Sequence, residues 1–217
     1  MASPPLRNLA VLASGQGTNF EALALAERRG ELGGRIVALL CDRPDAPAIS
    51  RALRFGIEVV QPPTGRFRSR IEDEHAWIEA LRERGAEVLV LAGFMRRLHA
   101  TFLDAFADRT LNVHPSLLPA FPGLDAIGQA WRAGVRVTGV TVHLVTAALD
   151  AGPILAQRAV AIGDDETLES LEERVHEAEH ALYPATVSRF LTEPGHVEGG
   201  RFVWTPPVGA PRTGGSR

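Results

Sequence analysis

The sequence predicts an α/β protein, with a Rossmann-like, mixed but mostly parallel sheet that carries helices on both faces. In the first half of the chain, short apolar runs alternate with helix-like segments. Those runs lack regular polar alternation, which is typical of parallel strands buried on both faces. In the second half, the connection between the strand-like runs 137–145 and 154–162 is too short for an easy parallel crossover. We therefore expect this last pair to be antiparallel.

The individual elements follow from the apolar runs and from the residues that end them. Gly30 and Gly56 end the first two helices, and Pro62 ends the third strand. The last helix contains Pro184, which can interrupt it. In chain order we predict strands at 9–13, 36–41, 57–60, 88–92, 110–113, 137–145 and 154–162, and helices at 20–29, 49–55, 71–84 and 167–191.

Composition and length favour one domain. The chain has 217 residues, of which 45% are hydrophobic and 23% charged, the balance of a folded globular protein. We predict a single domain over residues 1–194 and a Gly/Pro-rich tail over 195–217, in which Arg201 to Trp204 could add an edge strand.

Charge, apolar runs and cysteine content argue against several kinds of partner and against an internal disulfide. The net charge of −3 argues against nucleic acid or an anionic membrane as a partner. No run is long enough to cross a bilayer, and the N-terminus does not look like a secretory signal. The single Cys41 cannot form an internal disulfide. We expect a cytoplasmic protein that is a monomer or a homodimer.

A Gly-rich turn follows the first predicted strand. Ser14 to Asn19 leads into a helix, where free main-chain N–H groups can bind an anion. Gly15 and Gly17 leave room for a phosphate to approach, but Phe20 stands where a dinucleotide fingerprint has Gly. A monophosphate or a carboxylate is therefore favoured over NAD, and a tight turn without a ligand is the alternative.

Asn112 and His114 are the strongest candidates for catalysis by residue type. They are two apart at a strand end, so their side chains point the same way, and Pro115 ends the strand. An Asn can stabilise an oxyanion and a His can move protons near neutral pH. Asp150, in the loop before Gly152, could be the carboxylate partner of a histidine. Taken singly, each residue could instead serve a turn.

The segment His176-Glu177-Ala178-Glu179-His180 matches the H-E-x-x-H pattern of zinc peptidases. Helical spacing turns His176 and His180 away from the apolar stripe, toward solvent, and no third ligand is evident. Glu179 lies at the edge of that stripe and could reach inward. We therefore expect no metal.

Five blocks make the chain similar to the phosphoribosylglycinamide formyltransferases, folate-dependent enzymes of purine synthesis. The resemblance covers about residues 6–191, and it implies the formyltransferase fold. It also implies transfer of the formyl group of 10-formyltetrahydrofolate, a co-substrate, to the amine of glycinamide ribonucleotide. In chain order the blocks are Ser14 to Asn19, Leu91 to Arg96, Asn112 to Gly123, Leu149 to Pro153 and Glu179 to Pro184.

The resemblance implies roles for individual residues. Asn112, His114 and Asp150 match the catalytic group. Asn112 and a protonated His114 would stabilise the oxyanion, while Asp150 would keep His114 charged and relay a proton through water. The substrate-binding positions match Gly17, Thr18, Asn19, Arg70, Pro115 and Glu179. The folate-binding positions match Met95, Arg96, Arg97, Leu98, Leu103, Val145, Thr146, Ala147 and Ala148.

The chain departs from the family pattern in two loops. Asp125 and Ile127 stand where the family has histidines, and Asp125 is expected to oppose the substrate phosphate electrostatically. Ala147 and Ala148 stand where the family has Asp and Glu.

Other functions remain open at this point. A formyltetrahydrofolate hydrolase usually has an extra domain before this region, and methionyl-tRNA formyltransferase has one after it, so the length of this chain disfavours both. A non-catalytic folate- or nucleotide-binding module and a zinc peptidase are further alternatives.

Overall fold

The computed structural model describes residues 7–65 and 70–205. Residues 1–6 of the predicted domain and 206–217 of the predicted tail therefore lie outside the described residues. The elements are β1 (Arg7–Ala13), α1 (Thr18–Arg28), β2 (Gly34–Cys41), α2 (Pro47–Phe55), β3 (Val59–Val60), α3 (Glu74–Glu83), β4 (Val88–Leu91), α4 (Ala100–Ala105), β5 (Thr110–His114), α5 (Ala126–Arg132), β6 (Val137–Leu144), β7 (Ile154–Ala161), α6 (Leu168–Thr192), β8 (Gly195–Glu198) and β9 (Arg201–Trp204).

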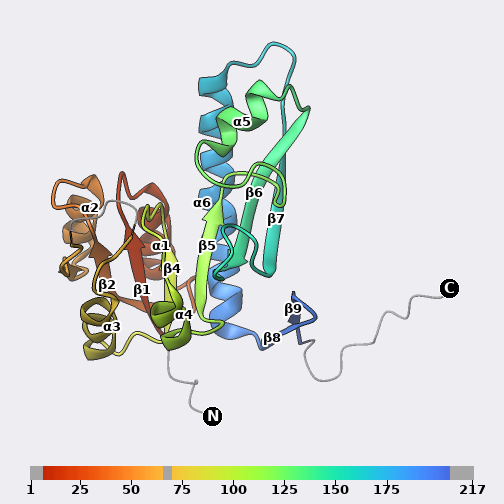
Figure 1. Cartoon of the computed structure of the whole chain (residues 1–217). Coiled ribbons are helices and arrows are strands. Elements are labelled where there is room, and N and C mark those ends of the chain that lie inside the picture. The colour runs from red at the N-terminus through yellow and green to blue at the C-terminus, as the bar shows by residue number, and fades with distance from the viewer. Residues whose placement is uncertain (1–6, 66–69, 206–217) are drawn as a thin grey trace.

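The main sheet is mixed, as predicted. Its seven strands have the order β3-β2-β1-β4-β5-β6-β7 (Figure 1). All pairs from β3 to β5 are parallel. The β5–β6 and β6–β7 pairs are antiparallel. The predicted change from parallel to antiparallel pairing is thus confirmed.

Side chains of the central strands alternate between two cores. On β1, Leu9 and Val11 belong to one buried cluster, with residues of α1, α2 and α6. Ala10 and Leu12 belong to the other, with residues of α3 and α4. Strand side chains alternate between faces, so helices must cover both faces of this part of the sheet. This arrangement confirms the predicted fold class.

Two short helices and a hairpin were not predicted. Helices α4 and α5 have only 6 and 7 residues, too few to show a helical period. Arg201 to Trp204 pairs with β8 through a turn at Gly199 and Gly200, both at positive φ, instead of extending the main sheet. Its aromatic residues pack on α6, where Phe202 contacts Phe190 at a ring distance of 5.8 Å. The predicted strand at Arg201 to Trp204 is therefore present, but it lies in a separate hairpin and not at the edge of the main sheet.

Two predicted helices differ in detail. Helix α3 begins at Glu74 rather than at residue 71, because the Asp73 side chain accepts hydrogen bonds from the N–H groups of His75 and Ala76. Helix α6 continues through Pro184 to Thr192. Pro184 is buried, so packing of the helix outweighs the one main-chain hydrogen bond that proline cannot make. None of the described helices is long and apolar enough to span a membrane.

Candidate active site

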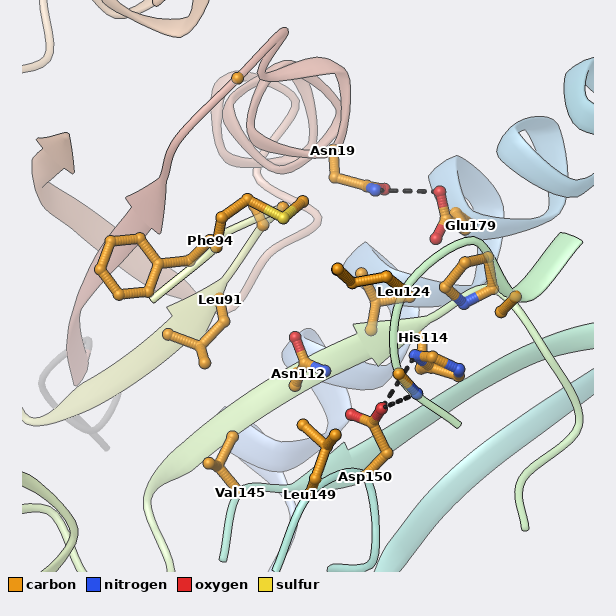
Figure 2. A pocket seen from close by; sticks show the side chains of 18 of the residues that line it. Asn19, Leu91, Phe94, Asn112, His114, Leu124, Val145, Leu149, Asp150 and Glu179 are labelled. Carbon is orange, nitrogen blue, oxygen red and sulfur yellow. Dashed lines mark hydrogen bonds and ion pairs between the residues drawn. The ribbon is translucent and has the colours of Figure 1, made fainter. Parts of the chain in front are cut away.

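A cleft of about 770 Å³ opens where β1, β4 and β5 end (Figure 2). Ligands of open α/β sheets bind beyond these carboxyl ends, where strand order changes direction. In this chain β5 also pairs with β6, the first antiparallel strand of the sheet. The lining segments are 15–19, 91–98, 112–115, 123–127, 143 and 145–150, together with Glu172, His176 and Glu179 of α6.

Strand register places Asn112 beside a histidine. Asn112 pairs with His143 across the antiparallel β5–β6 ladder, so both side chains lie on the same face. The Asn112 Nδ2 atom lies 3.2 Å from Nε2 of His143, and Nδ1 of His143 lies 2.8 Å from the Leu144 carbonyl oxygen. A carbonyl only accepts, so Nδ1 carries the proton and Nε2 accepts from Asn112. One N–H of Asn112 remains for the cleft.

His143 is 2% exposed, and burial lowers its pKa below the ordinary 6.5. The ring is therefore held in the neutral form that Asn112 needs as an acceptor. The contact of His143 with Asn112 depends on a strand pairing that is distant in sequence, so no local pattern predicts it.

His114 and Asp150 meet at the same place, as Figure 2 shows. Nδ1 of His114 lies 3.6 Å from Oδ2 of Asp150, and both side chains are largely buried. Nε2 of His114 lies 2.9 Å from the Phe121 carbonyl, which fixes a proton on that nitrogen. Asp150 Oδ2 also accepts from the N–H of Gly123 at 2.7 Å. The three candidate catalytic residues thus lie together, two on β5 and one on the loop after β6.

The opposite end of the cleft is built from α1 and α6. Gly17 is the N-cap of α1, and no side chain caps the first turn of this helix. Asn19 Nδ2 donates to Oε2 of Glu179 at 3.1 Å, while the buried Oδ1 of Asn19 has no hydrogen-bond partner among the described residues. Glu179 is 4% exposed, so it reaches inward as predicted. His176 Nδ1 lies 2.9 Å from the same Oε2 atom of Glu179.

Gly17 lacks a side chain for a reason other than the one predicted. Its φ is +73°, and a Cβ there would lie 2.6 Å from Cβ of Ala48. Contact with α2 therefore requires glycine at this position. Gly15, in contrast, has open space where a Cβ would point.

The remaining wall of the cleft is apolar, and several of its side chains are exposed to solvent. Met95, Leu124 and Leu149 line the cleft with exposed fractions of 62%, 80% and 56%. Large apolar side chains gathered at a concave surface are typical of a binding site for an apolar ligand group. The predicted folate-binding residues that line the cleft are Met95, Arg96, Arg97, Leu98, Val145, Thr146, Ala147 and Ala148.

Two predicted binding residues lie off the cleft lining. Leu103 packs against the second core cluster. Arg70 forms an isolated bridge with Arg97, and its carbonyl accepts from Nη1 of Arg96 at 3.0 Å. The Arg96 side chain also pairs with the buried Asp42 carboxylate at 2.7 Å. Arg70 therefore contacts the cleft wall through its own main chain, which meets Arg96 and Arg97.

The departures from the family pattern are accommodated locally. The Asp125 carboxylate lies 2.8 Å from Nη2 of Arg132. This pairing offsets the charge that was expected to oppose a phosphate. Ile127 is 7% exposed and belongs to the first core cluster. Thr146 Oγ1 donates to the Ala148 carbonyl at 3.3 Å.

The H-E-x-x-H segment behaves differently from the prediction. His176 is half-exposed but lines the cleft, and His180 is partly buried, so only part of the solvent-facing prediction is correct. Helix α6 packs against α1 as well as the sheet, which covers more of its surface than the apolar stripe indicates. Among residues 7–65 and 70–205, no group of three or more His, Cys, Asp or Glu is placed to hold a metal ion.

The chain is similar to known formyltransferases, which agrees with the arrangement of the candidate residues in the cleft. Residues 7–187 match the formyl transferase family. The chain is 43% identical to the phosphoribosylglycinamide formyltransferase of Bacillus subtilis, over 86% of this chain and 95% of that protein. It is 37% identical to the enzyme of the same name from Escherichia coli, over 84% and 86%.

A solved structure shares the whole architecture. Glycinamide ribonucleotide transformylase 1 from Symbiobacterium toebii superimposes with a TM-score of 0.88 at 40% identity. The match covers 93% of this chain and 95% of that one.

Proposed function

Because this chain belongs to the formyl transferase family, we propose that it transfers the formyl group of 10-formyltetrahydrofolate to the amine of glycinamide ribonucleotide, in purine synthesis. One observation carries the assignment of the site. Asn112, His114 and Asp150 converge at the floor of a cleft that has a helix N-terminus at one end and an apolar wall at the other.

Asn112 and His114 stabilise the negative charge that develops on the formyl oxygen. His143 occupies one N–H of Asn112 and leaves the other for this oxygen. In its protonated form, His114 has a second N–H at Nδ1, on the side that faces Asp150 and the cleft. Preorganised donors of this kind contribute about 10²–10³ in rate each.

Asp150 supplies the negative charge for the imidazolium and a site for the proton of the amine. Its side chain is 10% exposed and lies beside both His114 and His143. The amine attacks the formyl carbon, and the tetrahedral intermediate then breaks the bond between that carbon and the folate nitrogen. The proton that the amine loses passes to the Asp150 carboxylate, directly or through water, and from there to the departing folate nitrogen, which releases tetrahydrofolate and restores the carboxylate. The folate supplies a formyl group that is already activated, so the chain supplies position and electrostatics.

The ribonucleotide fits the end of the cleft between α1 and α6. The uncapped first turn of α1 at Gly17, Thr18 and Asn19 presents main-chain N–H groups to a phosphate. Oδ1 of Asn19, buried and unpartnered within the described chain, is left for a donor group of the substrate. In this proposal Glu179, which accepts a hydrogen bond from Asn19, contacts the ribose, and Pro115 borders the same space.

The folate fits the apolar end. Arg96, Arg97, Leu98 and Met95 form one side of this end, and the loop from Val145 to Ala148 forms the other. The side chains at 147 and 148 are methyl groups, so polar contacts from these two residues come from the main chain. Arg70 and Leu103 support this wall from outside the cleft.

We further propose a single domain over residues 1–194 that functions in the cytoplasm as a monomer or homodimer, without nucleic acid, membrane or metal. The continuous seven-stranded sheet and the net charge of −3 support this description.

The test is a spectrophotometric transfer assay with 10-formyltetrahydrofolate and glycinamide ribonucleotide, in the presence of EDTA. We expect deformylation that requires the ribonucleotide. His114→Ala should lower kcat by about 10²–10³ while the protein remains folded, because one oxyanion donor is lost.

Three outcomes would contradict this proposal. Deformylation without the ribonucleotide would indicate a hydrolase. Full activity of a folded His114→Ala protein would remove His114 from the mechanism. Loss of activity with EDTA that zinc restores would indicate a metal enzyme.

A further inference from the structure

The loop between β5 and α5 holds both His114 and Asp150 by main-chain contacts. The Phe121 carbonyl contacts Nε2 of His114 at 2.9 Å, and the Gly123 N–H donates to Asp150 Oδ2 at 2.7 Å. The conformation of this loop is unusual, since Phe121 and Asp125 have φ values of 53° and 56°. Such residues persist only where surrounding contacts hold them.

Gln129 provides a contact of this kind. Its Nε2 atom donates to the carbonyl oxygens of Pro122 at 3.1 Å and Leu124 at 2.8 Å. Both hydrogens of the side-chain amide are therefore used on the loop. Gln129 is not among the residues that line the cleft, so it acts from behind the loop.

The Pro122 carbonyl and the Gly123 N–H belong to one peptide unit. In a trans peptide these two groups point in opposite directions. Gln129 and Asp150 thus bind opposite edges of the same peptide plane. A rotation of this plane would break both hydrogen bonds, and each bond polarises the peptide in the direction that strengthens the other.

We infer that Gln129 is a positioning residue, which fixes the Pro122–Gly123 peptide so that its N–H keeps the Asp150 carboxylate beside His114. This inference rests on the proposed function, in which the two side chains act together. It adds to that function a residue on α5 that touches neither substrate.

A second contact to the same loop is much weaker. Arg132 pairs with Asp125 at 2.8 Å, but the two side chains are 63% and 59% exposed. An ion pair exposed to this degree contributes little to order. It also contacts a side chain rather than the peptide that holds Asp150. Arg132→Ala is therefore a matched control on the same helix.

The experiment compares Gln129→Met, which keeps the length of the side chain but has no donor, with the wild type. We expect kcat to fall about tenfold, the order of the single hydrogen bond between Gly123 and Asp150 that is weakened at the site. The KM of both substrates should stay within about twofold of the wild-type value. Arg132→Ala should keep the wild-type kcat. Thermal unfolding checks that each variant is folded.

A spectroscopic measurement tests the contact without relying on turnover. In ¹⁵N-labelled protein, the Gly123 amide proton should move upfield in Gln129→Met, toward its position in Asp150→Asn, where the carboxylate is absent. Arg132→Ala should leave this resonance in place. If Gln129→Met does not fold, Gln129→Glu is used with the same two measurements, because its carboxylate cannot donate to the two carbonyls.

A folded variant with unchanged kcat, or with an unmoved Gly123 resonance, would overturn the inference. Failure of the proposed function would look different. In that case the wild type itself would not transfer formyl groups, while the Gly123 resonance would still report on the contact with Gln129.

Discussion

His176 lies at the end of the cleft that we propose for the ribonucleotide, and its surroundings favour the protonated form of the ring. Its Nδ1 hydrogen bonds to Glu179, and this contact raises the pKa of His176 above the ordinary 6.5. In the protonated form of the ring, Nε2 carries a second N–H that can donate to a bound phosphate. The ring belongs to the cleft lining together with Gly17 and Asn19.

Substitution of His176 should weaken binding of the ribonucleotide rather than the chemistry. For His176→Gln we expect the KM for glycinamide ribonucleotide to rise about tenfold or more, since a charge-assisted hydrogen bond contributes about 1.5–3 kcal/mol. The kcat and the KM for folate should change little. Steady-state kinetics with each substrate varied in turn measures this. His180→Gln, one turn further along α6, is the control, and an equal rise in KM there would contradict a specific role of His176.

At the residue scale, the sequence predicts which side chains lie together where residues close in the chain point to the same side of a strand. Asn112 and His114 are two apart on a strand, so alternation alone predicts that they face one space. The partners of these residues depend on contacts distant in sequence. Asn112 meets His143, 31 residues further along the chain, through strand register. Local pattern does not encode such pairings.

At the scale of elements, α6 is joined to the sheet directly beneath the candidate catalytic residues. The hydroxyl of Tyr183, which is fully buried, lies 2.9 Å from the Leu91 carbonyl on β4 and 3.1 Å from the Leu111 carbonyl on β5. Leu111 precedes Asn112, and Leu91 pairs with Asn112 in the β4–β5 ladder. This hydroxyl therefore connects the long helix with two of the three strands at which the cleft opens, β4 and β5.

Tyr183→Phe should destabilise the protein with little direct effect on the chemistry. We expect the free energy of unfolding to fall by about 1–3 kcal/mol, because two buried carbonyls lose a donor. Urea denaturation followed by circular dichroism measures this. Thr186→Val is the matched control. It removes a buried hydroxyl that bonds only within α6, to the Leu182 carbonyl at 2.8 Å. A larger loss in the control than in Tyr183→Phe would contradict the connecting role.

The length of an element decides whether sequence alone reveals it. Helices α1, α2, α3 and α6, of 9 to 25 residues, are long enough to show an apolar period, and side chains cap the starts of α3 and α6. Helices α4 and α5 are shorter than two helical turns, and tertiary contacts rather than a pattern define them. The hairpin of β8 and β9 is fixed by aromatic packing on α6.

At the scale of the whole molecule, two histidines couple folding to pH in opposite directions. Burial lowers the pKa of His143 below 6.5. As pH falls below about 6.5, the unfolded chain binds a proton that the folded protein does not, so stability decreases. The pKa of His176 is raised above 6.5 by its hydrogen bond to Glu179. Its contribution is complete below about 6.5 and is lost as pH rises through the folded pKa.

These two histidines together should give a maximum in the free energy of unfolding near pH 6.5. Urea denaturation at constant ionic strength, from about pH 5.5 to 8, measures the profile. His143→Gln should reduce the slope on the acidic side, where His180, whose pKa burial also lowers, keeps the remaining part. His176→Gln should flatten only the alkaline side. Each variant is compared with the wild type by the slope against pH, because absolute stability also reflects packing. Slopes that remain unchanged in both variants would show that other groups set the pH dependence.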